Sequence, residues 1–277
     1  MKKILLCEGC SWTAGSLGDD NNVINPELAD VLDNNLMHWR NDDYRLPRLW
    51  PHKLGKLLNV NVKNVAVPGS SNDTIVRRTI NNVLSLLKQY NGDEIFVIIG
   101  WTSPERKDFY HKDMVFPADA NWFTLRPAEI KNYLKNKDNK HLHSFFTNYG
   151  KYFWNREEYM SRYINHNLYL HYFLESYGIG HLFYSAFYEG EHSITDITEG
   201  LISNVDSKEK ESAEEFFKIY SKVFKDISFR KYVMETVAPK NTENIHSTKF
   251  FKDHHPTEIG HQMWAEELYN DLKDIIC

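Results

Sequence analysis

The segment KKILLCEGCSWTAG, residues 2–15, decides how the rest of the sequence is interpreted. It begins with a short apolar run of strand length that ends at Gly9. It then offers two kinds of chemistry: a Cys-x-x-Cys pair, Cys7 and Cys10, and a serine, Ser11, just after the run. The segment is therefore a thiol or metal site, a turn that presents a serine nucleophile, or only the end of a buried strand.

Strand-like and helix-like patterns alternate along the chain after this segment. The run at 94–101 is continuously apolar, which is typical of a central parallel strand. Asn72 or Asp73 is expected to cap the second helix. The alternation predicts a right-handed parallel α/β sheet. Strands are expected over 3–8, 62–67, 94–101 and 181–187, and helices over 46–58, 74–90, 156–177 and the closing segment 255–276.

Composition fits a single globular domain spanning residues 1–277. Hydrophobic residues make up 42% of the 277 residues, enough for one large core. The alternation of strand-like and helix-like segments is less regular over about 103–155, which is rich in aromatic residues. It is also less regular over 190–250, which contains a charged helical segment. We expect these two segments to be insertions in one domain.

Charge and hydropathy exclude several classes of protein. The formal net charge of −5 argues against a basic surface built to bind nucleic acid. No apolar run approaches the length of about 18 residues that a membrane span needs. Acidic Glu8 follows the first apolar run at once, and no signal-type cleavage stretch appears. We therefore expect a cytoplasmic protein without a membrane span.

The cysteine pair is a weak signal for redox or metal chemistry. Redox motifs usually place the first cysteine at a helix N-terminus, whereas Cys7 lies inside the expected strand. Zinc would need two more ligands, for which His254, His255 and His261 are the candidates. Two small buried hydrophobic residues are the favoured interpretation. We expect neither a cofactor nor a metal at this segment.

The end of the chain offers Ser11 a catalytic partner. Ser11 follows the first parallel strand, and ligands of open α/β sheets bind beyond the carboxyl ends of the strands. Asp253 and His255 stand directly before Pro256, at the start of the closing helix. A serine hydroxyl needs a general base, and the base needs a carboxylate to orient it. Taken singly, however, such a serine is more often a helix cap and such a histidine pair a surface loop.

Taken together, these segments resemble the SGNH (GDSL-like) hydrolase superfamily. The first block of that superfamily is similar to EGCSWTAG, at Gly9, Ser11 and Gly15. The later blocks are similar to NVAVPGSSN, which contains Asn64, Gly69 and Asn72, to IIGWTSPER after the third strand, and to DHHPTEIGH before the closing helix. The blocks occur in the right order at strand ends and helix starts, and GCSWT followed by WTSPER resembles bacterial and phage-encoded members.

The resemblance implies a three-layer α/β/α flavodoxin-like fold and the hydrolysis of esters. It implies that Ser11 is the nucleophile, His255 the general base and Asp253 its orienting carboxylate. The oxyanion hole would use the backbone N–H groups of Ser11 and Gly69 and a third donor. Each such donor is worth roughly 3–4 kcal/mol of activation barrier.

The chain departs from the family pattern at three points. Cys10 stands where the usual aspartate precedes the serine, and the Asp253–His255 spacing is two residues where three are common, which leaves His254 as a rival base. The third-block asparagine that would complete the oxyanion hole is absent. Thr102 stands at its position, and Asn72 is the second candidate donor.

The expected substrate is a small-molecule or glycan ester, most plausibly one that carries a small acyl group such as acetyl. Aromatic residues crowd the first insertion, where they suit sugar rings or acyl chains, or form the core of the insertion itself. Two rival functions stay open: an acyltransferase that uses the same triad, and a catalytically inactive binding protein with the same fold.

Overall fold

The computed structural model describes residues 3–15, 45–110, 122–126, 140–187, 207–237, 251–252 and 255–276. Its centre is a four-stranded sheet in the order β2-β1-β3-β6. All three pairings in this sheet are parallel. The four strands are β1 (Ile4–Gly9), β2 (Asn61–Asn64), β3 (Ile95–Trp101) and β6 (Gly180–Ser185).

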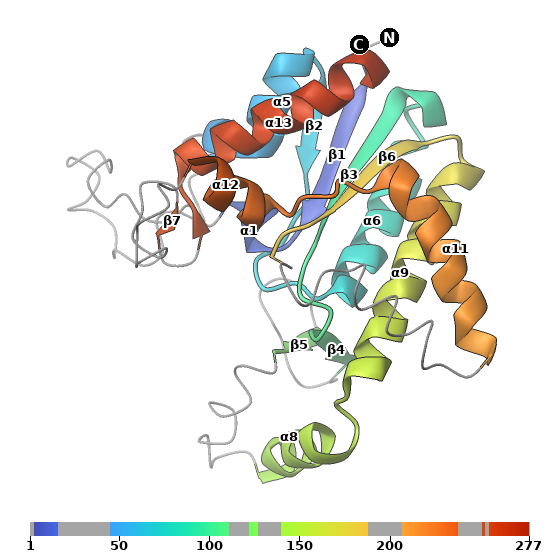
Figure 1. Ribbon diagram of the computed structural model, residues 1–277. Helices are drawn as coiled ribbons and strands as arrows, with labels where there is room; N and C mark the ends of the chain where they lie inside the picture. Colours follow the sequence, from blue (N-terminus) through green and yellow to red (C-terminus); the bar gives the residue numbers. More distant parts are fainter. Residues whose placement is uncertain are drawn as a thin grey trace.

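Helices cover both faces of the sheet, which confirms the predicted three-layer α/β/α architecture (Figure 1). On one face, α6, α9 and α11 pack over the sheet, and on the other α5, α12 and α13 do so. Their bounds are α5 (Trp50–Leu58), α6 (Asn72–Leu86), α9 (Arg156–Ser176), α11 (Ser207–Val223), α12 (Phe229–Val237) and α13 (Glu258–Ile276).

Alternating side chains of the central strands build the two cores. In β1, Leu6 packs against the α6 and α9 side, while Leu5 and Cys7 pack against the α5 and α13 side. In β3, Val97 packs in the core on the α6 and α9 side, and Ile98 packs in the core on the α5 and α13 side. This is the alternation that a strand imposes on successive residues, and it explains why apolar residues follow one another directly in both strands.

Several helix boundaries differ from the predicted ones because of local capping. Ser71, not Asn72 or Asp73, is the N-cap of α6, and its side chain accepts a hydrogen bond from the Thr74 backbone N–H at 3.1 Å. The segment predicted as one helix over 46–58 divides into a short 3₁₀ turn, η1 (Leu46–Arg48), and α5, with Leu49 extended between them. Pro51 lies in the first turn of α5, as expected.

The predicted first insertion contains a small hairpin and a helix. The hairpin pairs β4 (Lys107–Tyr110) with β5 (Trp122–Leu125), and the helix is α8 (Lys140–Tyr152). Phe109, Phe123 and Tyr149 pack on one another with ring centroids 5.3–5.6 Å apart. Phe123 and Tyr149 are buried, so these aromatic residues form a local core.

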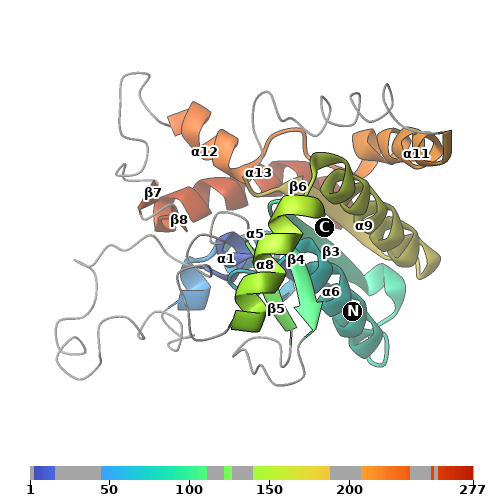
Figure 2. The same ribbon diagram turned by 90° about the horizontal axis from the view of Figure 1, so that it is seen from below.

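Two helices of the segment predicted as a second insertion contribute to the main cores. Phe216 of α11 is fully buried with α6 and α9, and Figures 1 and 2 both place α11 beside α9. Phe229 of α12 is fully buried with α5 and α13 and stacks on Trp264 at 4.9 Å. These helices therefore complete the layers of the domain. Among the described residues, no helix has both the length and the apolar character needed to cross a bilayer.

A buried histidine in α13 joins the closing helix to α5. His261 has no exposed surface, and its Nδ1 accepts a hydrogen bond from the Trp50 backbone N–H at 3.4 Å. This contact provides an acceptor for a donor in the first turn of α5. Burial, together with the charges of Lys53 and His255, lowers the pKa of His261 to about 3. His261 is therefore a neutral acceptor for the Trp50 N–H.

Replacing His261 with glutamine should make the free energy of unfolding depend less on pH in the acid range. In the unfolded chain His261 has a pKa of about 6.5, so it binds a proton below that pH, whereas in the native state it stays neutral down to about pH 3. The free energy of unfolding therefore falls as the pH falls from about 6.5 towards about 3. The wild type should lose about 2 kcal/mol of unfolding free energy from this group between about pH 7.5 and about pH 5. Urea denaturation at both pH values measures the difference.

The His261→Gln variant should lack this part of the loss, since the amide still accepts from Trp50 but does not titrate. His143→Gln is the control, because His143 is exposed on α8. Equal pH dependence in the wild type and the His261 variant would contradict the assignment.

Candidate active site

Ser11 lies in a tight turn at the carboxyl end of β1. It is the first residue of the four-residue helix α1 (Ser11–Ala14), with Cys10 as N-cap. Gly15 ends this helix in the left-handed conformation at φ 88°, and its N–H donates to the Ser11 carbonyl at 2.9 Å. The strand, the turn and the glycine together hold the Ser11 backbone at the edge of the sheet.

The turn around Ser11 is supported by polar contacts from two neighbouring strands. The side-chain amide of Asn64, the last residue of β2, donates to the Thr13 carbonyl at 2.8 Å. The Thr13 hydroxyl lies 3.2 Å from the buried Tyr184 hydroxyl of β6. Burial raises the pKa of Tyr184 far above its usual range, so its hydroxyl stays protonated. These contacts fix α1 from both sides.

The closing segment brings His255 directly to Ser11. The His255 Nε2 atom lies 3.0 Å from the Ser11 Oγ atom, across 244 positions of sequence. His255 begins β8 (His255–Pro256), which pairs with β7 (Phe251–Lys252) in an antiparallel ladder just before α13. The distance is that of a hydrogen bond between a hydroxyl and a ring nitrogen. The geometry therefore suits transfer of the serine proton to the imidazole.

Asp253 and His254 lie outside the described residues. Their predicted roles, as the orienting carboxylate and as the rival base, stay predictions. His255 is the histidine that the structure brings to Ser11.

Gly69 occupies the turn between β2 and α6 with φ at 77°, a conformation that favours glycine. Arg126, at the end of the β4–β5 hairpin, lies over this turn. A Cβ atom added at Gly69 would stand 2.6 Å from the Arg126 Nη2 atom. A second guanidinium, that of Arg106, donates to the Ser70 carbonyl at 3.1 Å. Two arginines thus converge on the turn that the sequence predicts as part of an oxyanion hole.

Asn72 and Thr102 bind each other. The Asn72 side-chain oxygen accepts from the Thr102 N–H at 3.0 Å, and its amide nitrogen donates to the Thr102 carbonyl at 3.2 Å. Both residues are buried. The Thr102 hydroxyl is also buried and has no hydrogen-bond partner among the described residues. Asn72 therefore fixes the backbone after β3, while Thr102 keeps a hydroxyl that is available as a donor.

Aromatic side chains pack around the residue that follows Ser11. Trp12, the next residue, packs edge-on against Phe187 and Phe229 at centroid distances of 5.0 and 5.3 Å. The Arg106 guanidinium lies 5.6 Å from the Phe187 ring centroid. The same guanidinium thus contacts both the Ser70 carbonyl and the Phe187 ring.

The two cysteines of the opening segment are buried thiols. Cys7 and Cys10 have no exposed surface, and both pack in the core on the α5 and α13 side. Burial, followed by the charge of Glu8, raises the pKa of Cys7 well above its usual value. The buried hydrophobic interpretation is therefore the correct one for Cys7, because a reactive cysteine needs a lowered pKa and access to solvent.

An ion pair with a buried carboxylate lies next to the site, and the sequence patterns do not predict it. Glu8 has no exposed surface, and its Oε2 lies 3.4 Å from the Arg78 Nε of α6. Its Oε1 accepts from the Gly9 N–H at 3.2 Å. Arg78 also donates to the Val65 carbonyl at 2.7 Å. Glu8 and Arg78 thus fasten α6 to the strand that leads into Ser11.

The comparison with family models assigns the chain to a family. A model described as "Family of unknown function (DUF6071)" matches residues 27–210, more than half of the 277 residues. The chain belongs to this family. The matched range contains Gly69, Asn72 and Thr102 but neither Ser11 nor His255. No curated protein matches the sequence.

The chain is similar to several solved structures, among them members of the G-D-S-L family. One, from Desulfitobacterium hafniense DCB-2, is assigned to the lipolytic proteins of that family and is 13% identical, with 98% of this chain and 99% of that chain covered and a TM-score of 0.47. A lipolytic family member from Veillonella parvula DSM 2008 is 13% identical, with 99% of both chains covered and a TM-score of 0.44. Phospholipase A1 from Streptomyces albidoflavus NA297 is 11% identical, with 98% and 99% covered and a TM-score of 0.39.

Removing one partner of the Glu8–Arg78 pair should destabilise the protein more than removing both. Arg78→Met leaves the Glu8 charge buried without its guanidinium, at a cost of about 3–5 kcal/mol in unfolding free energy. Glu8→Gln keeps the shape and the acceptor for Gly9, so it should cost less. Urea denaturation of both single variants and of the double variant measures the coupling.

The double variant, Glu8→Gln with Arg78→Met, should be more stable than Arg78→Met alone, since the buried charge is gone. If the loss of unfolding free energy in the double variant equals the sum of the losses in the two single variants, the two side chains do not interact energetically.

Proposed function

We propose that the protein is a serine hydrolase that cleaves an ester through an acyl-enzyme intermediate. Ser11 acts as the nucleophile and His255 as the general base, with Asp253 as the carboxylate that orients His255. The distance of 3.0 Å between Ser11 Oγ and His255 Nε2 carries this proposal. The resemblance of four sequence blocks to SGNH hydrolases supports it.

The proposed reaction follows from the positions of the two side chains. As Ser11 Oγ attacks the ester carbonyl carbon, its proton passes to His255 Nε2. The tetrahedral intermediate collapses, His255 returns the proton to the leaving alcohol, and the acyl group stays on Ser11. A water molecule, deprotonated by His255, then attacks the acyl-enzyme and releases the acid. Asp253 would bind the Nδ1–H and stabilise the imidazolium in both steps.

The proposed oxyanion hole combines the backbone N–H groups of Ser11 and Gly69 with the Thr102 hydroxyl. Negative charge develops on the carbonyl oxygen only as Ser11 attacks, so donors fixed in advance stabilise the transition state more than the substrate. The buried Thr102 hydroxyl is without another partner among the described residues, which supports its use as the third donor. The amide of Asn72 is engaged by the Thr102 backbone, so Asn72 is better placed to position that donor than to replace it.

The acyl group is proposed to be small, such as an acetyl group on a glycan or metabolite. The edge-on packing of Trp12 with Phe187 supports this choice, because it places bulky rings beside the nucleophile. Arg106 and Arg126 at the Gly69–Ser70 turn favour an alcohol portion that carries an anionic or strongly polar group.

Transfer of the acyl group to an acceptor other than water uses the same nucleophile and is the second candidate. The competing hypothesis of an inactive binding protein is disfavoured by the hydrogen-bond distance between Ser11 and His255, since binding alone does not require that contact.

A fluorophosphonate probe should label the wild-type protein at Ser11. The serine must be activated by a base to react, so labelling reports the nucleophile and His255 together. Ser11→Ala should abolish labelling, and His255→Ala should lower its rate by about 100-fold or more. Gel fluorescence and peptide mass spectrometry measure the rate and the site.

Two variants serve as controls in this experiment. Ser85→Ala, exposed on α6, should label like the wild type. His254→Ala should also label normally if His255 is the base. Labelling that persists in Ser11→Ala would remove Ser11 from its role, and a loss confined to His254→Ala would exchange the roles of the two histidines.

Thr102→Val should separate the oxyanion role from a packing role. Valine keeps the shape but removes the hydroxyl, so kcat for a small aryl ester such as p-nitrophenyl acetate should fall by about 100-fold with little change in KM. Steady-state kinetics with this ester measure both constants.

Thr79→Val is the matched control, because Thr79 is a fully buried threonine of α6 whose hydroxyl binds the Ile75 carbonyl. An unchanged kcat in Thr102→Val would leave the oxyanion to the backbone donors alone.

A further inference from the structure

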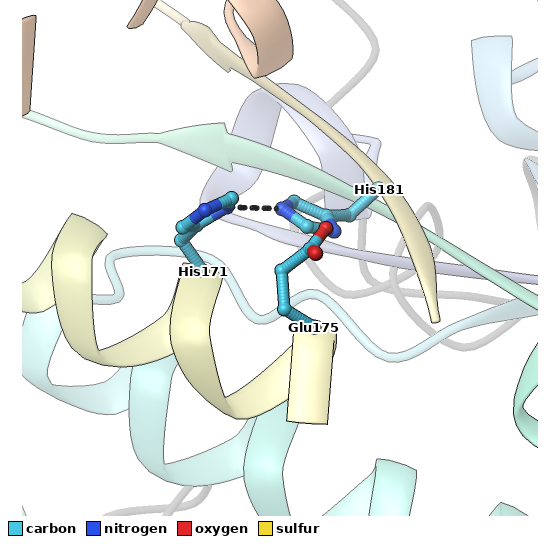
Figure 3. Close-up of side chains that lie close together, drawn as sticks. All are labelled: His171, Glu175 and His181. Atoms are coloured by element: carbon cyan, nitrogen blue, oxygen red, sulfur yellow. Dashed lines mark hydrogen bonds between the residues drawn. The ribbon is translucent and has the colours of Figure 1, made fainter. Parts of the chain in front are cut away.

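A second cluster of chemically active side chains lies away from Ser11. His171 and Glu175 are one turn apart on α9, and His181 is the second residue of β6 (Figure 3). One potential ligand atom from each of the three residues lies within 4.8 Å of the others. The cluster lies where β6 begins, whereas Ser11 lies beyond the opposite end of the parallel strands. It is therefore separate from the proposed hydrolase site.

The hydrogen bonds fix the chemical form of His181. Its Nδ1 lies 3.0 Å from the Ile179 carbonyl oxygen, and because a carbonyl only accepts, Nδ1 carries the proton. The Nε2 atom of neutral His181 therefore has a free lone pair, and it lies 2.9 Å from the His171 Nδ1 atom. A ring N–H bound to a backbone carbonyl is the arrangement that orients histidine ligands in metal sites.

The two imidazoles are buried between α9 and β6, and the carboxylate of the cluster is exposed. Burial lowers the pKa of His171 and the pKa of His181, and each ring has little exposed surface. Glu175 is exposed, so the cluster is open to solvent on one side. From α11, the charges of Lys222 and Glu215 also act on the pKa of His171, Lys222 lowering it and Glu215 raising it.

We propose that His171, Glu175 and His181 form a binding site for a zinc-like divalent cation. Two imidazole nitrogens and one carboxylate oxygen are ligands that zinc accepts readily, with a water molecule in the fourth position. The exposed side of the cluster, at Glu175, provides room for that water.

The observed geometry needs only a small adjustment to hold the ion. Zinc–nitrogen bonds of about 2.0–2.1 Å separate two tetrahedral ligands by about 3.3 Å, slightly more than the 2.9 Å between the two rings. On binding, His171 moves its proton from Nδ1 to Nε2 by exchange with solvent, and both rings stay neutral. The shared hydrogen bond is replaced by two metal bonds.

A bound ion would join α9 to the sheet across the turn that contains Gly178 and Ile179. Since α9 packs on α6 and α11, such a link would stabilise one whole face of the domain. Because the ligands come together only in the native state, zinc should raise the melting temperature.

Zinc titration of the metal-stripped protein tests the site. After dialysis against EDTA, titration calorimetry should show that the protein binds one zinc ion per chain, and the variants below assign that ion to this cluster. At about 100 times Kd, zinc should raise Tm by roughly 5 to 10 °C. Glu175→Gln, an exposed change that leaves the core intact, should weaken binding by about 10-fold or more, and His171→Gln should weaken it further.

His143→Gln and Glu157→Gln are the matched controls, because both residues are exposed and Glu157 lies on the same helix as Glu175. Both should bind zinc as the wild type does, and so should Ser11→Ala, since the site does not involve the nucleophile. Absence of zinc binding, or wild-type affinity in both Glu175→Gln and His171→Gln, would overturn the proposal.

Discussion

Burial of β1 on both faces is the constraint on which the rest of the structure depends. All six of its residues are buried, and its backbone pairs with β2 on one side and β3 on the other. A strand in this position can offer groups to a ligand only at its ends. The chain must turn at the carboxyl end, and Ser11 is the first residue of that turn. The location of the candidate nucleophile thus follows from hydrophobic burial several residues earlier.

The order of strands and helices was predictable because it depends on local patterns. The run around Val97 is apolar throughout and the run around Leu6 is apolar from Ile4 to Cys7, as central parallel strands require, and turn residues end them. Capping was less predictable: Ser71, Asn72 and Asp73 are all competent caps, and tertiary contacts of Asn72 with Thr102 leave Ser71 as the cap. The role of α11 and α12 in the main cores depends on packing across distant segments, which periodicity does not report.

The candidate site was predictable only where a short block of sequence contains it. Ser11 and Gly69 stand in such blocks, whereas Arg126 reaches Gly69 from a hairpin far along the chain. Glu8 looked like a polar interruption in an apolar run, because its partner Arg78 lies on a different element. His171 and His181 likewise have no motif spacing, and only the packing of α9 on β6 brings them together.

The separation of 244 positions between Ser11 and His255 has a consequence for biosynthesis. A growing chain contains Ser11 long before His255 has been translated, so the proposed catalytic pair cannot form until translation has passed His255. Closure of so long a loop also makes this contact a late event in folding. Under the proposed mechanism, an acylating reagent would therefore label only molecules in which Ser11 and His255 have come together, and a product that ends before His255 would not react.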